Sequence, residues 1–265
     1  MKNTYLIRGG LQGRERLRIL SQVMQSSGVA LLRRAGVGAG ASCLDVGCGG
    51  GDLACDFARL VGAEGRVVGV DIDETKLSLA QSEALSLGFR NIEFRHLDIT
   101  KAVVGEKFDF VHARFLLTHL PDPAAALARM AAALKPGGVL VLQDIDMEGQ
   151  FSWPASPAMD RYKDLYTRVA RCRGGDPFIG RRLPALLAAA GLNSIAFNVV
   201  QPAATSGDVK LIAPITMENI AASLIDEGLA SATEVEQIIA ELYASAHDPN
   251  MLMSVPRIVE AWAQA

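Results

Sequence analysis

The segment Leu44-Asp45-Val46-Gly47-Cys48-Gly49-Gly50-Gly51-Asp52-Leu53 determines the fold that we expect for this chain. It overlaps a short apolar run, Ser42 to Val46, and leads into a helical pattern from Leu53 to Val61. A strand, a tight turn and a helix in this order form the place where parallel sheets bind nucleotides. Glycines in the turn permit positive φ angles and leave no side chain between backbone and ligand. Because such turns also occur without a ligand, the surrounding chain must support this interpretation.

Strand and helix patterns alternate downstream of the glycines. Apolar segments typical of strands cover residues 66–70, 91–97, 107–113 and 139–145. A helix is predicted after Asp73, which can cap it, and a second from Pro123 to Leu134, where Pro136-Gly137-Gly138 stops it. This alternation predicts a mostly parallel sheet that is covered by helices on both faces, in a Rossmann-like α/β fold.

The two ends of the chain are predicted to be mainly helical. Apolar residues recur with helical spacing from Gly13 to about Ala35, and Ser26-Ser27-Gly28 is expected to separate two helices there. After Gly149 the expected helices cover 157–171, 184–190, 207–228 and 233–246, and a strand is expected over 194–200. The helices beyond residue 200 contain too few apolar residues for a second core.

Composition excludes several classes of protein. The 265-residue chain has a formal net charge of −3, which argues against a nucleic-acid partner. It has no apolar run long enough for a membrane span and no secretory signal, so we expect a soluble, cytoplasmic protein. Its four cysteines and four histidines lack the spacing of metal ligands, so no metal site is expected.

Three aspartates follow or end three successive predicted strands. Asp45 can complement a cationic amine and would repel a pyrophosphate, which favours an amino-acid-bearing cofactor over a nicotinamide dinucleotide. Asp71 has the position of the acid that hydrogen-bonds ribose in nucleotide-binding folds. Asp98 can accept from an adenine amino group, with Ile72 and Ile99 against the ring, although a helix N-cap is an alternative role for it.

The chain resembles the class I S-adenosylmethionine-dependent methyltransferases. The motifs that carry the resemblance are Leu44 to Leu53, Val68 to Asp73, His96 to Thr100, Phe108 to Pro123 and Leu134 to Leu142. The start, Tyr5-x-x-Arg8-Gly9-Gly10 with Glu15-Arg16-Leu17-Arg18, is similar to the bacterial subgroup that includes the ubiquinone and menaquinone biosynthesis methyltransferases.

The resemblance implies a cofactor, S-adenosylmethionine, and a small-molecule methyl acceptor with an O, N or C nucleophile. It implies that the backbone at Gly47 and Gly49 approaches the methionine part, that Asp71 holds the ribose, and that Asp98 and Ile99 read the adenine. The end of the fourth strand, at Ala113 and Arg114, is then expected beside the sulfonium.

The resemblance also implies a seven-stranded sheet with an antiparallel last strand. Residues 251–262, beside 194–200, suit this strand, and the helices between them are expected to form an insertion over the substrate pocket. We therefore expect a single methyltransferase domain, 1–265. It comprises an N-terminal helical cover (1–36), a cofactor-binding core (37–146) and a substrate-side segment (147–265).

The residues expected around the methyl acceptor indicate their roles less clearly than the cofactor motifs do. His119 is a candidate general base because its ordinary pKa lies near neutrality, although a histidine at this place often simply packs. Aromatic residues expected around the acceptor are Tyr5, Phe115 and Trp153, with Phe151, Tyr162 and Tyr166 in the same segments.

Two other functions remain open from the sequence. A nicotinamide-dependent oxidoreductase shares the glycine turn and the acid after the second strand. A protein that binds S-adenosylmethionine without transferring its methyl group would carry the same cofactor motifs. The atom methylated and the oligomeric state are not indicated by the sequence.

Overall fold

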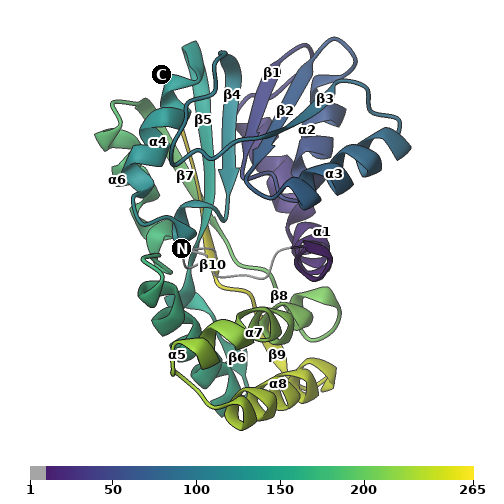
Figure 1. Cartoon of the computed structure of the whole chain (residues 1–265), viewed down its shortest axis with the longest axis vertical. Helices are drawn as coiled ribbons and strands as arrows, with labels where there is room; N and C mark the ends of the chain where they lie inside the picture. Colours follow the sequence, from purple (N-terminus) through teal and green to yellow (C-terminus); the bar gives the residue numbers. More distant parts are fainter. Residues whose placement is uncertain (1–9) are drawn as a thin grey trace.

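The fold centres on a seven-stranded sheet with the order β3-β2-β1-β4-β5-β10-β7 (Figure 1). The computed structural model describes the backbone of residues 10–265 and the side chains of residues 13–265. The strands are β1 (Ser42–Val46), β2 (Arg66–Asp71), β3 (Ile92–His96), β4 (Phe108–Arg114), β5 (Leu134–Asp146), β7 (Asn193–Val200) and β10 (Arg257–Gln264). β10 runs antiparallel to both of its neighbours, β5 and β7, whereas the other neighbouring pairs are parallel. The predicted Rossmann-like sheet with a reversed last strand is therefore confirmed.

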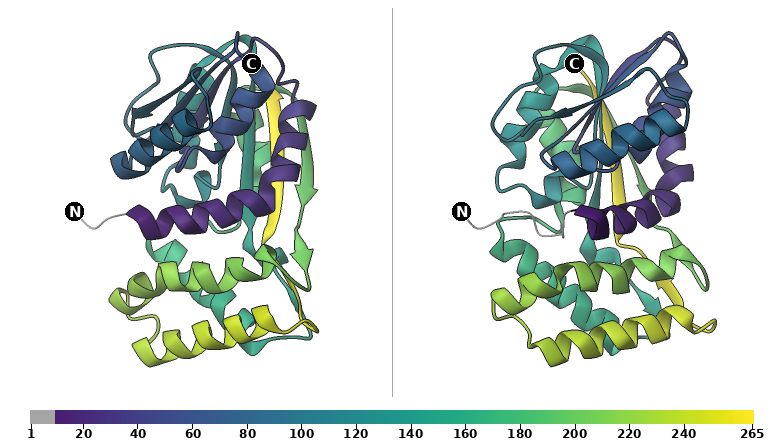
Figure 2. Two further views of the ribbon diagram at one scale, coloured as in Figure 1. Left: turned by 90° about the vertical axis from the view of Figure 1, so that its right-hand side faces the viewer. Right: turned by 45° about the vertical axis from the view of Figure 1, so that its right-hand side comes forward.

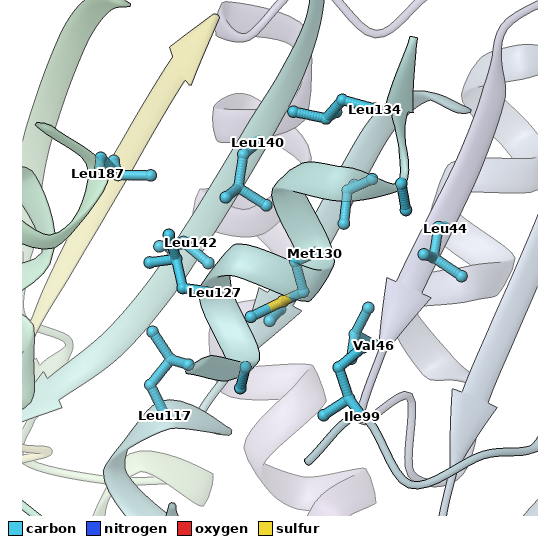
Figure 3. Packing of buried hydrophobic residues seen from close by; sticks show 14 of the residues in the cluster. Leu44, Val46, Ile99, Leu117, Leu127, Met130, Leu134, Leu140, Leu142 and Leu187 are labelled. Carbon is cyan, nitrogen blue, oxygen red and sulfur yellow. The ribbon is translucent and has the colours of Figure 1, made fainter. Parts of the chain in front are cut away.

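Apolar clusters cover both faces of this sheet. On one face, α2 (Asp52–Val61) and α3 (Glu74–Ser86) pack with Cys43 and Phe57 in one cluster. On the other face, α4 (Pro123–Ala132) and α6 (Leu183–Ala189) pack over Leu44 and Leu140 in a second cluster (Figure 3). Consecutive residues of β1, Cys43 and Leu44, are thus buried on opposite faces, as expected for a strand in the middle of a parallel sheet.

The N-terminal segment forms one helix, α1 (Gly10–Arg34), so the predicted separation at Ser26-Ser27-Gly28 is wrong. Ser27 Oγ donates to the Met24 carbonyl three residues earlier, so the serine hydroxyl finds its hydrogen-bond acceptor within the helix. Glycine costs about 1 kcal/mol relative to alanine in a helix. Burial of Met24 and Leu31 offsets that cost. Tertiary packing therefore overrides the local signal for a break.

Three helices lie at the carboxyl ends of the parallel strands, below the sheet in Figure 1. They are α5 (Pro157–Cys172), α7 (Asp208–Asp226) and α8 (Ala232–His247). They share a third apolar cluster with Leu20 and Met24 of α1 and with Ile145 and Ile258 of the main sheet. In Figure 2, the first part of α1 lies between the main sheet and α7 and α8. No helix among residues 10–265 has both the length and the apolar character needed to cross a membrane.

The predicted last strand, 251–262, is divided in the structure. Its first part, β9 (Leu252–Ser254), pairs with β6 (Ser152–Trp153) and β8 (Ala203–Ala204) in a small antiparallel sheet that the sequence did not predict. The second part, β10, joins the main sheet. Pro256 lies between them, and because proline has no N–H and a fixed φ it is poorly suited to the middle of a ladder.

Candidate active site

A cleft of about 1280 Å³ opens at the carboxyl ends of the parallel strands. Its walls come from the glycine turn after β1, the loops after β2, β3 and β4, and the helices α1, α5 and α7. Cavities that hold one small ligand usually measure about 300–1,000 Å³. This cleft therefore has room for a cofactor and a second small molecule.

The glycine turn brings the main chain to the wall of the cleft. Gly47 and Gly49 adopt φ angles of +70° and +53°. The N–H groups of Gly47 and Cys48 both donate to the Val70 carbonyl, at 2.8 and 3.0 Å. A Cβ on Gly47 would lie 3.2 Å from Leu116 Cδ1. The turn is therefore joined to β2 and depends on glycine at residue 47 for both conformation and space.

Asp45 lies at the inner end of the cleft and starts a buried chain of polar side chains. His112 Nδ1 lies 3.0 Å from Asp45 Oδ1, and His112 Nε2 lies 3.4 Å from Gln143 Oε1. Gln143 Nε2 donates to Glu260 Oε1 at 3.0 Å, and Asn198 Nδ2 donates to Glu260 Oε2 at 2.9 Å. This chain crosses β1, β4, β5, β10 and β7. Sequence reasoning missed it, although charged and amide residues within predicted apolar strands were a visible signal.

Asp71 connects the end of β2 to the glycine turn. Its Oδ2 accepts from the Gly49 N–H at 2.9 Å and its Oδ1 accepts from the Asp73 N–H at 3.0 Å. A carboxylate offers about four acceptor positions, so both oxygens keep acceptor capacity for hydroxyl groups in the cleft. Ile72 also lines the cleft and is 52% exposed.

Asp98 caps a turn and lines the cleft at the same time. Its Oδ1 accepts from the N–H and the hydroxyl of Thr100, and its Oδ2 lies 2.8 Å from Lys101 Nζ. Burial raises the pKa of Asp98, but the hydrogen bonds from Lys101 and Thr100 outweigh it and leave the pKa lowered. No helix begins after Asp98, so Asp98 caps a turn rather than serving as a helix N-cap. Ile99, beside it, is buried and also borders the cleft.

Arg114 and Ala113 point in different directions at the end of β4. Ala113 packs its side chain into the core beneath α4, so only its backbone remains for ligand contact. Arg114 lines the cleft, and its Nη2 lies 3.4 Å from Ser21 Oγ. Its buried Nη1 has no hydrogen-bond partner within the described part of the chain. Burial lowers the pKa of Arg114, and the nearby carboxylates, first of all Asp45, oppose this shift.

His119 ends the short helix η1 (Leu117–His119) and lines the cleft. Burial lowers the pKa of its imidazole to about 3, and the positive charges of Arg16 and Lys76 contribute. The ring is therefore neutral at physiological pH and a weak base. This argues against the candidate role of general base, which is most effective when the pKa lies near the working pH.

The predicted aromatic pocket is only partly assembled. Phe115, Tyr162 and Tyr166 line the cleft, and Phe115 has an unusual φ of +54° for a non-glycine residue. Trp153 is 71% exposed in β6 and does not line the cleft, so the structure does not support its expected role in substrate binding. The exposed Phe151 is also outside the cleft. Tyr5 lies outside the described residues.

Two cleft residues were not predicted from the sequence as a pair. Arg16 Nε donates to Thr216 Oγ1 at 3.1 Å, which joins α1 to α7. The residues are far apart in the chain, so no local pattern connects them. Both side chains are buried.

A reversed last strand in a parallel sheet, a glycine turn after β1 and acids at the ends of β1, β2 and β3 define a Rossmann-like methyltransferase. The sequence profile of a family described as a methyltransferase domain matches residues 38–178, just over half of the chain. The chain belongs to this family. The resemblance to the class I S-adenosylmethionine-dependent methyltransferases, and to their ubiquinone-biosynthesis subgroup, is thereby confirmed.

Relatives in this subgroup match about half of the chain. The ubiquinone/menaquinone biosynthesis C-methyltransferase UbiE of Hahella chejuensis is 36% identical over 136 residues, which cover 51% of this chain and 52% of that protein. A ubiquinone biosynthesis O-methyltransferase of Albidiferax ferrireducens is 39% identical over 102 residues, 38% of this chain and 39% of the relative. The matched region thus spans about half, or less, of the length of these relatives.

Solved structures show the same fold over most of the chain. The YcgJ protein of Bacillus subtilis has a TM-score of 0.60 at 19% identity, covering 90% of this chain and 98% of its own. A Thiobacillus denitrificans SAM-dependent methyltransferase in complex with S-adenosylhomocysteine has a TM-score of 0.53 at 21% identity, covering 92% and 91%. Phosphoethanolamine N-methyltransferase 2 of Haemonchus contortus has a TM-score of 0.58 at 15% identity, covering 93% and 56%.

Proposed function

We propose that this chain binds S-adenosylmethionine in the cleft and transfers its methyl group to a small organic acceptor. The observation that carries the proposal is the presence of opposite charges beneath the glycine turn. Asp45 is a buried carboxylate, Arg114 is a half-buried arginine whose buried Nη1 has no hydrogen-bond partner among the described residues, and both line the cleft. An anion beside a cation complements a zwitterionic amino acid, which is the end of this cofactor that a nicotinamide dinucleotide lacks.

The other cleft residues fit the remaining parts of the cofactor. Asp71 keeps acceptor capacity for the two ribose hydroxyls. Ile72 and Ile99 provide apolar contact for the adenine ring, next to Asp98 as an acceptor for its amino group. A pyrophosphate in the same position would meet Asp45, so electrostatic repulsion disfavours the nicotinamide alternative.

The chain would promote transfer mainly by alignment. The bound sulfonium supplies an activated methyl group whose departure leaves a neutral thioether. The glycine turn, Asp45 and Arg114 hold the donor, while the walls formed by α1, α5 and α7 hold the acceptor and exclude water. Proximity and orientation of this kind supply a large share of a rate enhancement. His119, with its low pKa, would contribute as a neutral polar wall of the site.

We place this activity in the cytoplasm. Cys43, Cys48 and Cys55 are buried free thiols, and burial raises the pKa of each of them. Such thiols are typical of proteins in a reducing compartment. The acceptor is proposed to be a small molecule rather than a nucleic acid, in keeping with the net charge of −3.

The direct test is calorimetric titration with S-adenosylhomocysteine, with NADH as a control ligand. We expect wild type to bind the first and not the second. Asp71→Asn should weaken binding by about tenfold or more, because hydrogen bonds to a charged acceptor contribute about 1.5–3 kcal/mol. Asp208→Asn, at an exposed position on α7, is the matched control and should bind as wild type does. A folded wild-type protein that binds NADH, or that binds neither ligand, would overturn the proposal.

A further inference from the structure

The charged residues that line the cleft lie mostly on one of its sides. Around the glycine turn and the carboxyl ends of the parallel strands, the lining includes the acids Asp45, Asp52, Asp71, Asp73, Glu74, Asp98 and Asp122 and the cations Lys76, Lys101, Arg114 and Arg129. The opposite wall is made by α1, α5, α7, β5 and β10, and most of its residues belong to the apolar cluster of the C-terminal helices. Among the described residues that these five elements contribute to the cleft, Arg16 is the only charged one.

Arg16 is buried and held in place by α7. Arg16 is only 9% exposed, and its Nε donates to Thr216 Oγ1 at 3.1 Å. Thr216 Oγ1 in turn donates to the Ile212 carbonyl at 2.6 Å, so the threonine is oriented by its own helix. The guanidinium is therefore fixed at the cleft wall rather than free in solvent.

Arg16 lacks the kind of ion pair that the neighbouring arginines of α1 form with carboxylates of the described residues. Arg14 pairs with Asp52 and Glu83, and Arg18 pairs with Glu15. Arg16 forms no ion pair with any carboxylate in the part of the chain that the structure describes. A buried cation is costly unless an anion compensates it, so the compensating anion is expected to come from a ligand.

The surroundings of Arg16 indicate what kind of ligand this is. Tyr162, Tyr166, Ile212 and Met147 line the same wall and offer apolar and aromatic surface. The charge of Arg16 acts within the cleft, since it lowers the pKa of His119, another cleft residue, in addition to the larger effect of burial. A single fixed guanidinium within an apolar wall complements an amphipathic anion.

We propose that the methyl acceptor is an organic acid with an apolar or aromatic body, whose carboxylate binds the Arg16 guanidinium while Thr216 fixes its orientation. This inference rests on the proposed function and names the class of substrate for the same cleft. A carboxylate could also come from the methionine part of the cofactor, and the experiment separates the two sources.

The first arm uses protein saturated with S-adenosylhomocysteine, so that the carboxylate of the cofactor is already in place. Phenylacetate and octanoate are titrated by calorimetry and compared with phenylacetamide and octanamide. We expect the acids to bind wild type at least about tenfold more tightly than the amides. Arg16→Met should remove this preference, Arg16→Lys should keep part of it, and Arg18→Met, on the exposed face of the same helix, should keep all of it.

Thr216→Val provides a second variant that keeps the charge and the side-chain volume. Thr216→Val should weaken binding of the acids several-fold. It should reduce the preference for acids over amides less than Arg16→Met does. Equal affinity for acids and amides in wild type, no binding of the acids, or a preference that survives in Arg16→Met would overturn the proposal.

The second arm measures S-adenosylhomocysteine and 5′-methylthioadenosine, which lacks the amino-acid part, on wild type and Arg16→Met. We expect both ligands to bind the two proteins equally within about threefold. If Arg16→Met weakens only S-adenosylhomocysteine, Arg16 binds the cofactor, and the acceptor assignment is overturned. If wild type fails to bind S-adenosylhomocysteine, the proposed function itself fails, which is distinct from a loss of the acid preference alone.

Discussion

His112 Nδ1 lies 3.0 Å from Asp45 Oδ1, at positions that face each other in the β1–β4 ladder. The imidazole is fully buried and Phe57 contacts it edge-on. Its other nitrogen faces the Gln143 carbonyl oxygen, whose amide group donates to Glu260. Both ring nitrogens of His112 thus lie within hydrogen-bonding distance of side-chain oxygens. His112 is therefore placed to hold the carboxylate that we assign to the amino group of the cofactor.

Replacing His112 should affect stability and cofactor affinity together. His112→Leu leaves the buried Asp45 carboxylate without its partner, which should cost about 3 kcal/mol of unfolding free energy. The affinity for S-adenosylhomocysteine should fall at least about tenfold, since Asp45 loses its orientation. His112→Asn, which can still donate to Asp45, should recover part of both losses. Urea unfolding and calorimetry check this, with His247→Asn on the exposed end of α8 as control. Unchanged affinity in a folded His112→Leu protein would contradict it.

Asp144 should make stability depend on pH. Burial raises the pKa of its carboxyl to about 7, against the opposing effect of backbone N–H groups from Ile145, Thr118 and Leu117. The folded state then binds a proton that the unfolded state, with an aspartate pKa near 3.9, releases. The contribution of Asp144 is present at low pH and is lost as the pH rises through the window from about 4 to 7. It amounts to about 4 kcal/mol over the full window.

The measurement compares wild type with Asp144→Asn by urea unfolding at several pH values. As the pH rises from 4 to 8, the unfolding free energy of wild type should fall relative to that of Asp144→Asn. The two proteins are compared because His119, which both contain, changes the stability with pH in the opposite direction. The folded-state pKa of His119 is lowered, so its contribution is lost as the pH falls below about 6.5. A pH-independent difference between the two proteins would contradict the prediction.

His119 should stay neutral throughout the physiological range. Its buried position and the charge of Arg16 lower its pKa to about 3. The ring resonances of His119 should therefore show no titration between about pH 5.5 and 8. Arg16→Met should raise this pKa, because one positive charge is removed from the neighbourhood. NMR of ring-labelled protein is the measurement, and a midpoint near 6.5 in wild type would contradict the expectation.

Comparing Gly47→Ala with Gly40→Ala should distinguish the effect of backbone strain on stability from an effect on ligand binding. Gly47 has φ +70°, and an alanine there should cost about 1–2 kcal/mol of stability. Gly40 has φ +79° with nothing near its would-be Cβ, so Gly40→Ala carries the same strain away from the cleft. Both variants should lose stability in urea unfolding, Gly47→Ala somewhat more because its Cβ also meets Leu116, but only Gly47→Ala should lose affinity for S-adenosylhomocysteine. Equal affinity in the two variants would remove the glycine turn from the binding site.

Local patterns in the sequence determined most of the sheet and its helices. The apolar runs around Asp45 and before Asp71 became β1 and β2, because strands buried on both faces need continuous apolar segments, and the segment before Asp98 became β3 at the edge of the sheet. The same patterns brought the glycine turn and the three acids to one edge, since the carboxyl ends of parallel strands meet there. These are properties of neighbouring residues, and a single sequence displays them.

The tertiary structure decided what depends on contacts between distant residues. It kept α1 as one helix through packing, and it divided the last strand at Pro256 into two sheets. Strands of two residues, such as β6, are too short to leave a pattern, and Trp153 within it turned away from the cleft.

The pairings His112 with Asp45 and Arg16 with Thr216 join elements far apart in the chain. No spacing in the sequence encodes such pairs, because they form only when the sheet and the C-terminal helices close around the cleft. The sequence by itself therefore determined the fold and the strand-end side of the cleft, whereas the side-chain partners and the helical wall of the cleft were decided by the tertiary structure.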